Sequence, residues 1–321
     1  MKIAFLGNFN VDYSSESHYL KTFQKLGHEV ITIQEGSSEL IQIINSSYKF
    51  YKDWDMFFWV HTHGWQTLCL DQVLNHLKIA HIPIVGYHLD LWMGIDRQKD
   101  LQNDDYWKWL DYFFTADRNF VPVLEKMGLK AYYLPAGVFE DECYIAEPDR
   151  VKYPHDIIFV GSRNYHPEWP YRKQLIEFLE KTYGNKFAQY GNGGLGTIRG
   201  HELNVLYASA KVVIGDTLCK NFDYPDYFSD RLFETTGRGG LLIMPYIRGL
   251  EDMFNMKGYC HEEQVEIITY KFEYLQQLLM KIDNVLVADP IDTYQLRLAG
   301  HKRTKRDHTY TQRLSYLLRN C

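Results

Sequence analysis

The feature that most constrains the fold is a regular alternation of short apolar runs with longer amphipathic stretches. The chain opens with a strand candidate at residues 2–6, a helical pattern at 16–26 and a second strand candidate at 28–33. Because parallel strands joined by helices are buried on both faces, this rhythm predicts an α/β fold with a parallel sheet. Further strand candidates lie at 56–61, 82–89, 112–115 and 131–134, with helical patterns at 68–78 and 119–127.

The alternation pauses once and then resumes. Residues 147–154 are polar and rich in proline, and a new strand candidate begins at 156. Since 321 residues suit two domains of ordinary size, we expect two doubly wound Rossmann-like domains. We place an acceptor-side N-terminal domain at 1–152, a donor-binding domain at 153–303 and a helix that packs back on the first domain at 304–321. The basic run 301–306 is expected to join two helices.

In each half, the first strand ends at a glycine, Gly7 or Gly161. A glycine at this turn lets the backbone approach a ligand at the carboxyl edge of a parallel sheet. Two such edges facing each other form a cleft, so we expect a ligand to bind between the domains.

Charge and cysteine content narrow the class of protein. The formal charge is −6, which gives no general attraction to nucleic acid or anionic lipid. The five cysteines are widely spaced without a C-x-x-C pair, which indicates a reducing compartment rather than a disulfide scaffold or a zinc ribbon. No signal peptide or membrane span is evident, so we expect a cytoplasmic protein.

The most informative segment runs from Asp226 to Pro245 and combines an acidic helix, a glycine turn and an apolar strand. In this layout the carboxylate of Glu234 can accept hydrogen bonds from both hydroxyls of a ribose. The alternative is that Arg231 and Glu234, three residues apart on one helical face, form a surface ion pair. The spacing alone does not decide between them.

Residues 229–243 resemble the signature helix and strand of GT-B glycosyltransferases, especially the CgeB-like (spore maturation) branch, in which an Arg-x-Phe-Glu stretch precedes a glycine and an apolar strand. The resemblance is clear over residues 155–315 and looser at 133–138, which is similar to the segment that closes the family's first domain. Further similar landmarks are 158–162, 189–191, 206–214, 300–303 and 308–313.

The resemblance implies a nucleoside diphosphate sugar, UDP-sugar foremost, bound mainly by the second domain and an acceptor bound mainly by the first. Glu234 matches the family's ribose-binding acid. Asp226 stands where retaining relatives often have a glutamate against the sugar, and its shorter side chain leaves that role open. The donor-binding set is Gly7, Asn8, Gly161, Ser162, Arg163, Tyr190, Gly191, Lys220, Ser229, Arg231 and Glu234.

Transfer from a diphosphate needs positive charge beside the leaving phosphates. Arg163 and Lys220 follow strands at the predicted ligand edge, and we expect them to clamp the diphosphate. Arg172 is a weaker candidate because it falls in the following helix. With two such cations no metal is obligatory.

The run from Gly191 to Gly196 matches G-x-G-x-x-G after a strand, with Asp216 about 20 residues later, which is the pattern of an NAD site. Residues 197–201 delay the next helix, however, whereas the phosphate grip of that motif needs the helix N-terminus inside the turn. An NAD(P)-dependent oxidoreductase is therefore an alternative, as is a non-catalytic nucleotide-sugar-binding protein.

Histidines follow two strands of the first half. His61, His63 and Trp65 are candidates for acceptor binding, and His88 is a candidate for acceptor binding or catalysis. Hydrogen-bonded histidines lining a polar cleft, or a metal site, are the other interpretations.

The sequence therefore predicts a retaining, metal-independent glycosyltransferase with the catalytic set His88, Asp90, Arg163, Lys220 and Asp226. His88 or Asp90 serves as base if transfer inverts. The expected acceptor is a glycan, small molecule or protein in preference to nucleic acid, with a modified DNA base as a further possibility.

Overall fold

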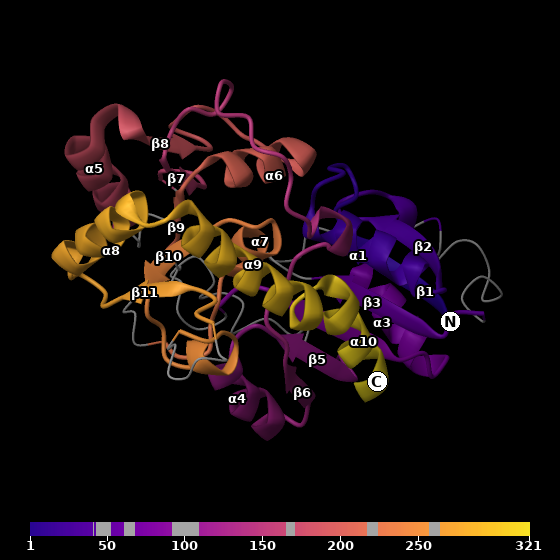
Figure 1. Ribbon diagram of the computed structural model, residues 1–321. Coiled ribbons are helices and arrows are strands. Elements are labelled where there is room, and N and C mark those ends of the chain that lie inside the picture. The colour runs from indigo at the N-terminus through magenta and orange to yellow at the C-terminus, as the bar shows by residue number, and fades with distance from the viewer. Residues whose placement is uncertain are drawn as a thin grey trace. The chain divides into compact units, whose positions relative to one another are not determined.

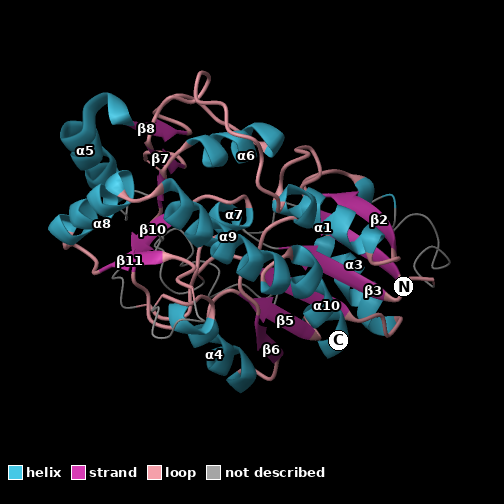
Figure 2. Cartoon of the chain, in the orientation of Figure 1, coloured by secondary structure: helices cyan, strands magenta, loops and turns pink. Residues whose placement is uncertain are grey.

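The computed structural model describes residues 1–40, 42, 53–60, 68–91, 109–164, 171–216, 224–256 and 264–321. The chain divides into two compact units (Figures 1 and 2). Unit 1 contains Met1–Pro135 and Tyr310–Cys321, and unit 2 contains Ala136–Thr309. Among the described helices, none is long and apolar enough to cross a membrane.

Unit 1 is built on a six-stranded parallel sheet with the order β2-β1-β3-β4-β5-β6. Every residue of β3 and β4 is buried, as expected for strands covered on both faces. The elements in chain order are β1 (Lys2–Gly7), α1 (Ser15–Lys25), β2 (Glu29–Gln34), β3 (Met56–Val60), α3 (Leu70–Ile79), β4 (Ile84–His88), β5 (Tyr112–Thr115), η3 (Arg118–Phe120), α4 (Val121–Lys126), β6 (Lys130–Tyr133) and α10 (Tyr310–Asn320).

Unit 2 has a five-stranded parallel sheet with the order β11-β10-β9-β7-β8. Figure 2 shows its strands among the helices of the unit. The elements are η4 (Glu140–Glu142), β7 (Ile157–Val160), α5 (Tyr171–Tyr183), η5 (Gly184–Lys186), β8 (Phe187–Tyr190), α6 (Gly200–Ser209), β9 (Val212–Ile214), α7 (Asp230–Gly237), β10 (Leu242–Pro245), η6 (Leu250–Asp252), β11 (Ile268–Tyr270), α8 (Leu275–Val287) and α9 (Pro290–Asp307).

Helices cover the sheets through apolar stripes at helical spacing. Leu70, Val73, Leu74 and Leu77 on α3 are buried in the core of unit 1. On α8, Leu278, Ile282 and Val285 are buried against the strands of unit 2. The predicted α/β class with two parallel sheets is confirmed, although β11 and α8 have no counterpart in the sequence prediction.

The units divide at residue 135 rather than at 152, where the polar segment placed the boundary. Residues 136–152 belong to unit 2 because side chains of its helices hold them. The Asn204 amide on α6 donates to the carbonyls of Glu142 and Tyr144, at 2.8 Å each. Arg238, which follows α7, forms an ion pair with Glu142.

The return to unit 1 begins at residue 310, not at 304. Helix α9 continues through the whole basic run 301–306, so the expectation of a joint there is wrong; the break falls at His308 and Thr309. Helix α10 then packs on α1, with the ring of Tyr310 4.6 Å from that of Tyr19 (Figure 1).

We predict that Leu314→Ala destabilises unit 1 by about 2–5 kcal/mol, because a fully buried leucine of α10 leaves a cavity. Urea unfolding of the full chain measures the change. Arg319→Ala, an exposed position on the same helix, is the matched control and should stay within about 0.5 kcal/mol of the parent. Equal stability of Leu314→Ala and the control would show that α10 contributes little to the core.

Candidate functional site

The carboxyl edge of the unit 2 sheet contains a topological switch point. The second strand, β8, lies on one side of β7 and the third, β9, lies on the other, so the connections leave in opposite directions. Open α/β sheets bind ligands at such a point. Gly161 follows β7 and Asp216 lies just beyond β9, so both residues lie at this edge.

Asp216 is a buried carboxylate shared by two arginines. Its Oδ2 lies 2.7 Å from Nε of Arg172, and its Oδ1 lies 3.2 Å from Nη2 of Arg172 and 2.9 Å from Nη1 of Arg231. The Asp216 side chain has no exposed surface, and that of Arg172 is 3% exposed. Charged groups persist at such burial only when they are paired and hydrogen-bonded, as these are.

The same arginines hold the turn that follows β7. Arg231 Nε donates to the carbonyl of Val160 at 2.8 Å, and Arg172 Nη1 donates to that of Ser162 at 3.2 Å. Between them, Gly161 has φ +149°, and a Cβ at that position would lie 2.8 Å from Nη2 of Arg231. The arginine–aspartate cluster therefore fixes the shape of the turn, and glycine is required there.

Two guanidinium groups share one carboxylate, so this cluster carries a net positive charge. Burial lowers the pKa of Arg231, but the carboxylates of Asp216 and Asp230 outweigh that effect and raise it, which keeps the guanidinium protonated. Preorganised positive charge at the carboxyl edge of a sheet is suited to binding phosphate.

Glu234 lies one turn further along α7 and is half-buried. Within the described part of the chain, its carboxylate has no hydrogen bond or ion pair, since Arg231 is bound to Asp216. The interpretation of Arg231 and Glu234 as a surface ion pair is therefore not supported. Burial and the nearby Asp230 raise the pKa of Glu234, while Arg238 opposes the shift. Its oxygens remain able to accept hydrogen bonds from a ligand.

Arg238, the residue that follows α7, anchors the end of that helix. Arg238 is 2% exposed and donates through Nη1 to the Gly200 carbonyl at 3.2 Å and to the Asn204 side chain, in addition to its ion pair with Glu142. Ser229 caps the other end of α7, with its hydroxyl accepting from the Arg231 N–H at 3.2 Å. Glu234 is thus placed on a helix fixed at both ends.

The glycine-rich run forms a closed loop rather than a phosphate grip. Gly191 N–H donates to the Gly196 carbonyl at 2.7 Å, and Gly194 N–H donates to the Gly191 carbonyl at 3.1 Å. Helix α6 begins only at Gly200, so its N-terminus lies outside the loop. A dinucleotide fingerprint needs free amides and an adjoining helix, so the geometry disfavours the NAD interpretation.

The glycine loop instead packs against the turn after β7. A Cβ at Gly191 would lie 2.4 Å from the Gly161 carbonyl oxygen, and the Arg163 N–H donates to the Asn192 carbonyl at 2.9 Å. Gln189 Nε2 donates to the Gly161 carbonyl at 2.5 Å. The second glycine run therefore supports the Gly161 turn by close backbone approach.

Of the two residues predicted to hold the diphosphate, Arg163 and Lys220, the structure describes only Arg163. Arg163 forms an ion pair with Glu180 on α5, in which Nη1 lies 3.0 Å from Oε2, so it must leave this partner to contact a diphosphate. Lys220 lies outside the described residues. Arg172, ranked lower in the sequence analysis, is in contact with the turn itself.

Two more predicted residues lie in unit 2. Asp226 has a left-handed φ of +61°, and its N–H donates to the Arg248 carbonyl at 2.9 Å, which ties it to the loop after β10. The Tyr190 hydroxyl pairs with His155 Nδ1 at 3.1 Å, and this tyrosine is buried.

In unit 1, Gly7 and His88 end β1 and β4 at the carboxyl edge of that sheet; Asn8 is exposed, His88 is fully buried and Asp90 is half-buried. His61, His63 and Trp65 lie outside the described residues.

Two acids of unit 1, Glu16 and Glu35, are not among the residues predicted from the sequence. Burial raises the pKa of Glu16, and burial together with the Glu16 carboxylate raises the pKa of Glu35. A Cβ at Gly7 would lie 2.9 Å from Glu16 Cγ, so the Glu16 side chain packs on the turn that follows β1.

Across the described residues, no group of three or more His, Cys, Asp or Glu side chains could hold a metal ion.

Comparisons with known proteins agree with this geometry. A family model described as glycosyl transferase-like matches residues 171–319. An α-glucosyltransferase solved with UDP matches with a TM-score of 0.69 and 11% identity, over 99% of each chain. A related structure, with UDP and a 13-mer DNA containing an HMU base, has a TM-score of 0.67 and 12% identity, over 100% of this chain and 99% of that one.

Anabaena Alr3699/HepE, solved with UDP and glucose, matches with a TM-score of 0.64 and 12% identity over the whole of both chains. Sucrose-phosphate synthase from Thermosynechococcus elongatus matches with a TM-score of 0.63 and 12% identity, over 99% of this chain and 98% of that one. No curated protein matches by sequence.

The structural matches show that the protein has the GT-B fold of these glycosyltransferases. Membership of the CgeB-like branch stays a prediction.

We predict that Asp216→Asn destabilises the protein by about 3–5 kcal/mol, because it leaves two buried guanidinium groups without their carboxylate. Urea unfolding measures the loss. Asp230→Asn changes the same charge at an exposed position nearby and should cost under about 1 kcal/mol. A loss at Asp216 no larger than that at Asp230 would mean that the cluster does not stabilise unit 2.

We also predict a large difference between two glycine substitutions in one loop. Gly196→Ala meets no atom within 4 Å and costs only the left-handed backbone strain, about 1–2 kcal/mol. Gly191→Ala adds a clash with the Gly161 carbonyl and should cost clearly more. Thermal unfolding compares the two proteins, and equal losses would show that the two turns do not approach so closely.

Proposed function

We propose that the protein is a glycosyltransferase that uses a nucleoside diphosphate sugar, with UDP-sugar as the donor. One observation carries the proposal: unit 2 holds the Asp216–Arg172–Arg231 cluster and, three residues after Arg231 on the same face of α7, the carboxylate of Glu234, which pairs with no described residue. The UDP and UDP-glucose complexes among proteins of the same fold support the choice of donor.

Each part of the donor has a candidate partner in this arrangement. Glu234 accepts hydrogen bonds from the ribose hydroxyls, and Arg231 with the Gly161 turn meets the diphosphate. Arg163 and Lys220 add charge to the diphosphate, once Arg163 leaves Glu180. The other donor contacts are Gly7, Asn8, Ser162, Tyr190, Gly191 and Ser229.

The reaction breaks the bond between the anomeric carbon and the β-phosphate oxygen and forms a bond from that carbon to an acceptor oxygen. Negative charge grows on the departing phosphates, and fixed arginines stabilise it without an obligatory metal. We propose retention of configuration, with the acceptor proton passing to the leaving phosphate and Asp226 facing the sugar.

For the acceptor we propose a glycan, a small molecule or a protein. The charge of −6 disfavours broad binding to duplex DNA, although some α-glucosyltransferase structures of this fold contain DNA. Acceptor contacts are assigned to unit 1, at His61, His63 and Trp65, and at His88 once this fully buried side chain becomes exposed. His88 or Asp90 would act as base in an inverting reaction.

An oxidoreductase is not favoured, because the loop that suggested it is closed by its own hydrogen bonds. We also propose a cytoplasmic location, which the free thiols of Cys69, Cys143 and Cys321 support.

We predict that Glu234→Gln lowers UDP affinity at least about tenfold, since it removes charged acceptance of the ribose hydroxyls at constant volume. The stability of the Glu234→Gln variant at pH 8 should equal or exceed that of the parent. The pKa of Glu234 is raised on folding, so its ionised carboxylate destabilises the folded state at this pH, and glutamine carries no such charge. Calorimetric titration and thermal unfolding measure the two effects.

Glu147→Gln, an exposed acid of the same unit, is the control and should bind UDP as the parent does. Uridine, which lacks the diphosphate, isolates the ribose contact, and its affinity should fall as the pH is lowered through the raised pKa of Glu234. UDP affinity of Glu234→Gln equal to that of the parent would remove Glu234 from the site.

A further inference from the structure

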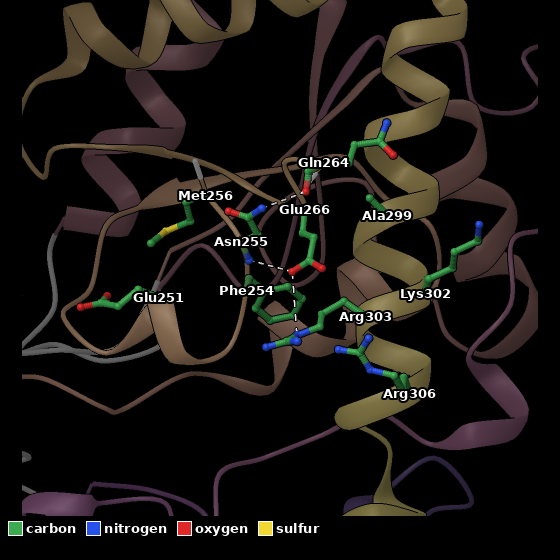
Figure 3. A pocket seen from close by; sticks show the side chains of 10 residues that line it. All are labelled: Glu251, Phe254, Asn255, Met256, Gln264, Glu266, Ala299, Lys302, Arg303 and Arg306. Atoms are coloured by element: carbon green, nitrogen blue, oxygen red, sulfur yellow. Dashed lines mark hydrogen bonds and ion pairs between the residues drawn. The ribbon is translucent and has the colours of Figure 1, made fainter. Parts of the chain in front are cut away.

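Unit 2 contains another cavity, which shares no residue with the arginine–aspartate cluster. Its volume is about 610 Å³, within the range of small-molecule sites (Figure 3). The lining comes from the segment after β10, the residues before β11 and one face of α9: Glu251, Phe254, Asn255, Met256, Gln264, Glu266, Ala299, Lys302, Arg303 and Arg306.

Helix α9 supplies three cations to this cavity. Arg303 is fixed, since its Nε donates to the Met253 carbonyl at 2.8 Å and its Nη1 lies 3.2 Å from Asp307. Arg306 Nη2 lies 2.7 Å from the same Asp307. Lys302 is exposed and makes no hydrogen bond or ion pair within the described part of the chain.

The remaining polar groups are suited to hydroxyls. Glu266 accepts from the Asn255 N–H at 2.7 Å and lies 3.9 Å from Arg303 Nε, as the dashed lines in Figure 3 mark. Burial raises the pKa of Glu266, and the neighbouring Arg303 and Arg306 oppose the shift. The Gln264 side chain has no hydrogen bond among the described residues, so its amide can both donate and accept.

The cations of the cavity all come from α9. The lining has three cations and two carboxylates, and Asp307 beside the lining pairs with both arginines, which leaves Lys302 as the cation without an acidic partner among the described residues. Glu251 lies at the other end in Figure 3, where its carboxylate accepts from the Gly249 N–H at 3.1 Å. The half-buried Met256 adds apolar surface to the lining, whereas Phe254 is buried against the rings of Phe233 and His308.

We propose that this cavity binds a small polyhydroxylated anion, a sugar that carries one phosphate or carboxylate group. The anionic group meets Lys302, Arg303 and Arg306, while the hydroxyls meet Gln264 and the glutamates. None of the lining residues is among those proposed above to bind UDP, so we expect occupation of the cavity not to depend on transfer activity.

Calorimetric titration of the full chain with glucose 6-phosphate and with glucuronate tests the proposal and separates the two anionic groups. We expect at least one of them to bind with a Kd below about 1 mM, and glucose and inorganic phosphate to bind at least about tenfold more weakly. Saturating UDP should leave the affinity unchanged. No binding of either sugar, or phosphate binding as tightly as the sugar phosphate, would overturn the proposal.

Lys302→Gln removes an unpaired cation and should weaken binding of the anionic sugar about five- to tenfold with an unchanged melting temperature. Lys305→Gln is the matched control, because Lys305 is an exposed lysine of the same helix that does not line the cavity. An equal loss in both variants would mean that the anion responds to the general charge of α9, and would contradict a built site.

Discussion

The structure of unit 2 depends on the sharing of one buried carboxylate by two arginines. Asp216 holds Arg172 and Arg231, and through them the carbonyls on both sides of Gly161. A buried aspartate without these partners would be strongly destabilising, and so would the arginines without it. The cluster therefore fixes the turn at the switch point of the sheet and leaves a net positive charge there.

The neighbouring features are arranged around that turn. The glycine loop after β8 packs its backbone against Gly161, which explains why it is rich in glycine without binding a dinucleotide. Helix α7 brings Arg231 into the cluster and places Glu234 one turn later, where none of the described residues pairs with it. In the proposed donor site, Arg231 meets the diphosphate and Glu234 accepts hydrogen bonds from the ribose.

The fold class could be predicted from the sequence because the spacing of apolar residues and the positions of glycines are local signals. The alternation of strands and helices, the turns at Gly7 and Gly161, and the helix with Glu234 are all visible within a few residues. Ion-pair partners are not local: Arg172 lies 44 residues from Asp216, and Arg163 lies 17 residues from Glu180. For the same reason the boundary was placed at the polar segment, although Asn204 and Arg238 hold residues 142–144 in unit 2.

Donor binding by the arginine–aspartate cluster is tested most directly by calorimetric titration of the full chain with UDP and with NAD, each with and without a chelator. We expect UDP to bind with the same affinity in both conditions, since arginines supply the positive charge, and NAD not to bind. Binding of NAD in preference to UDP, or loss of UDP binding in chelator, would contradict it.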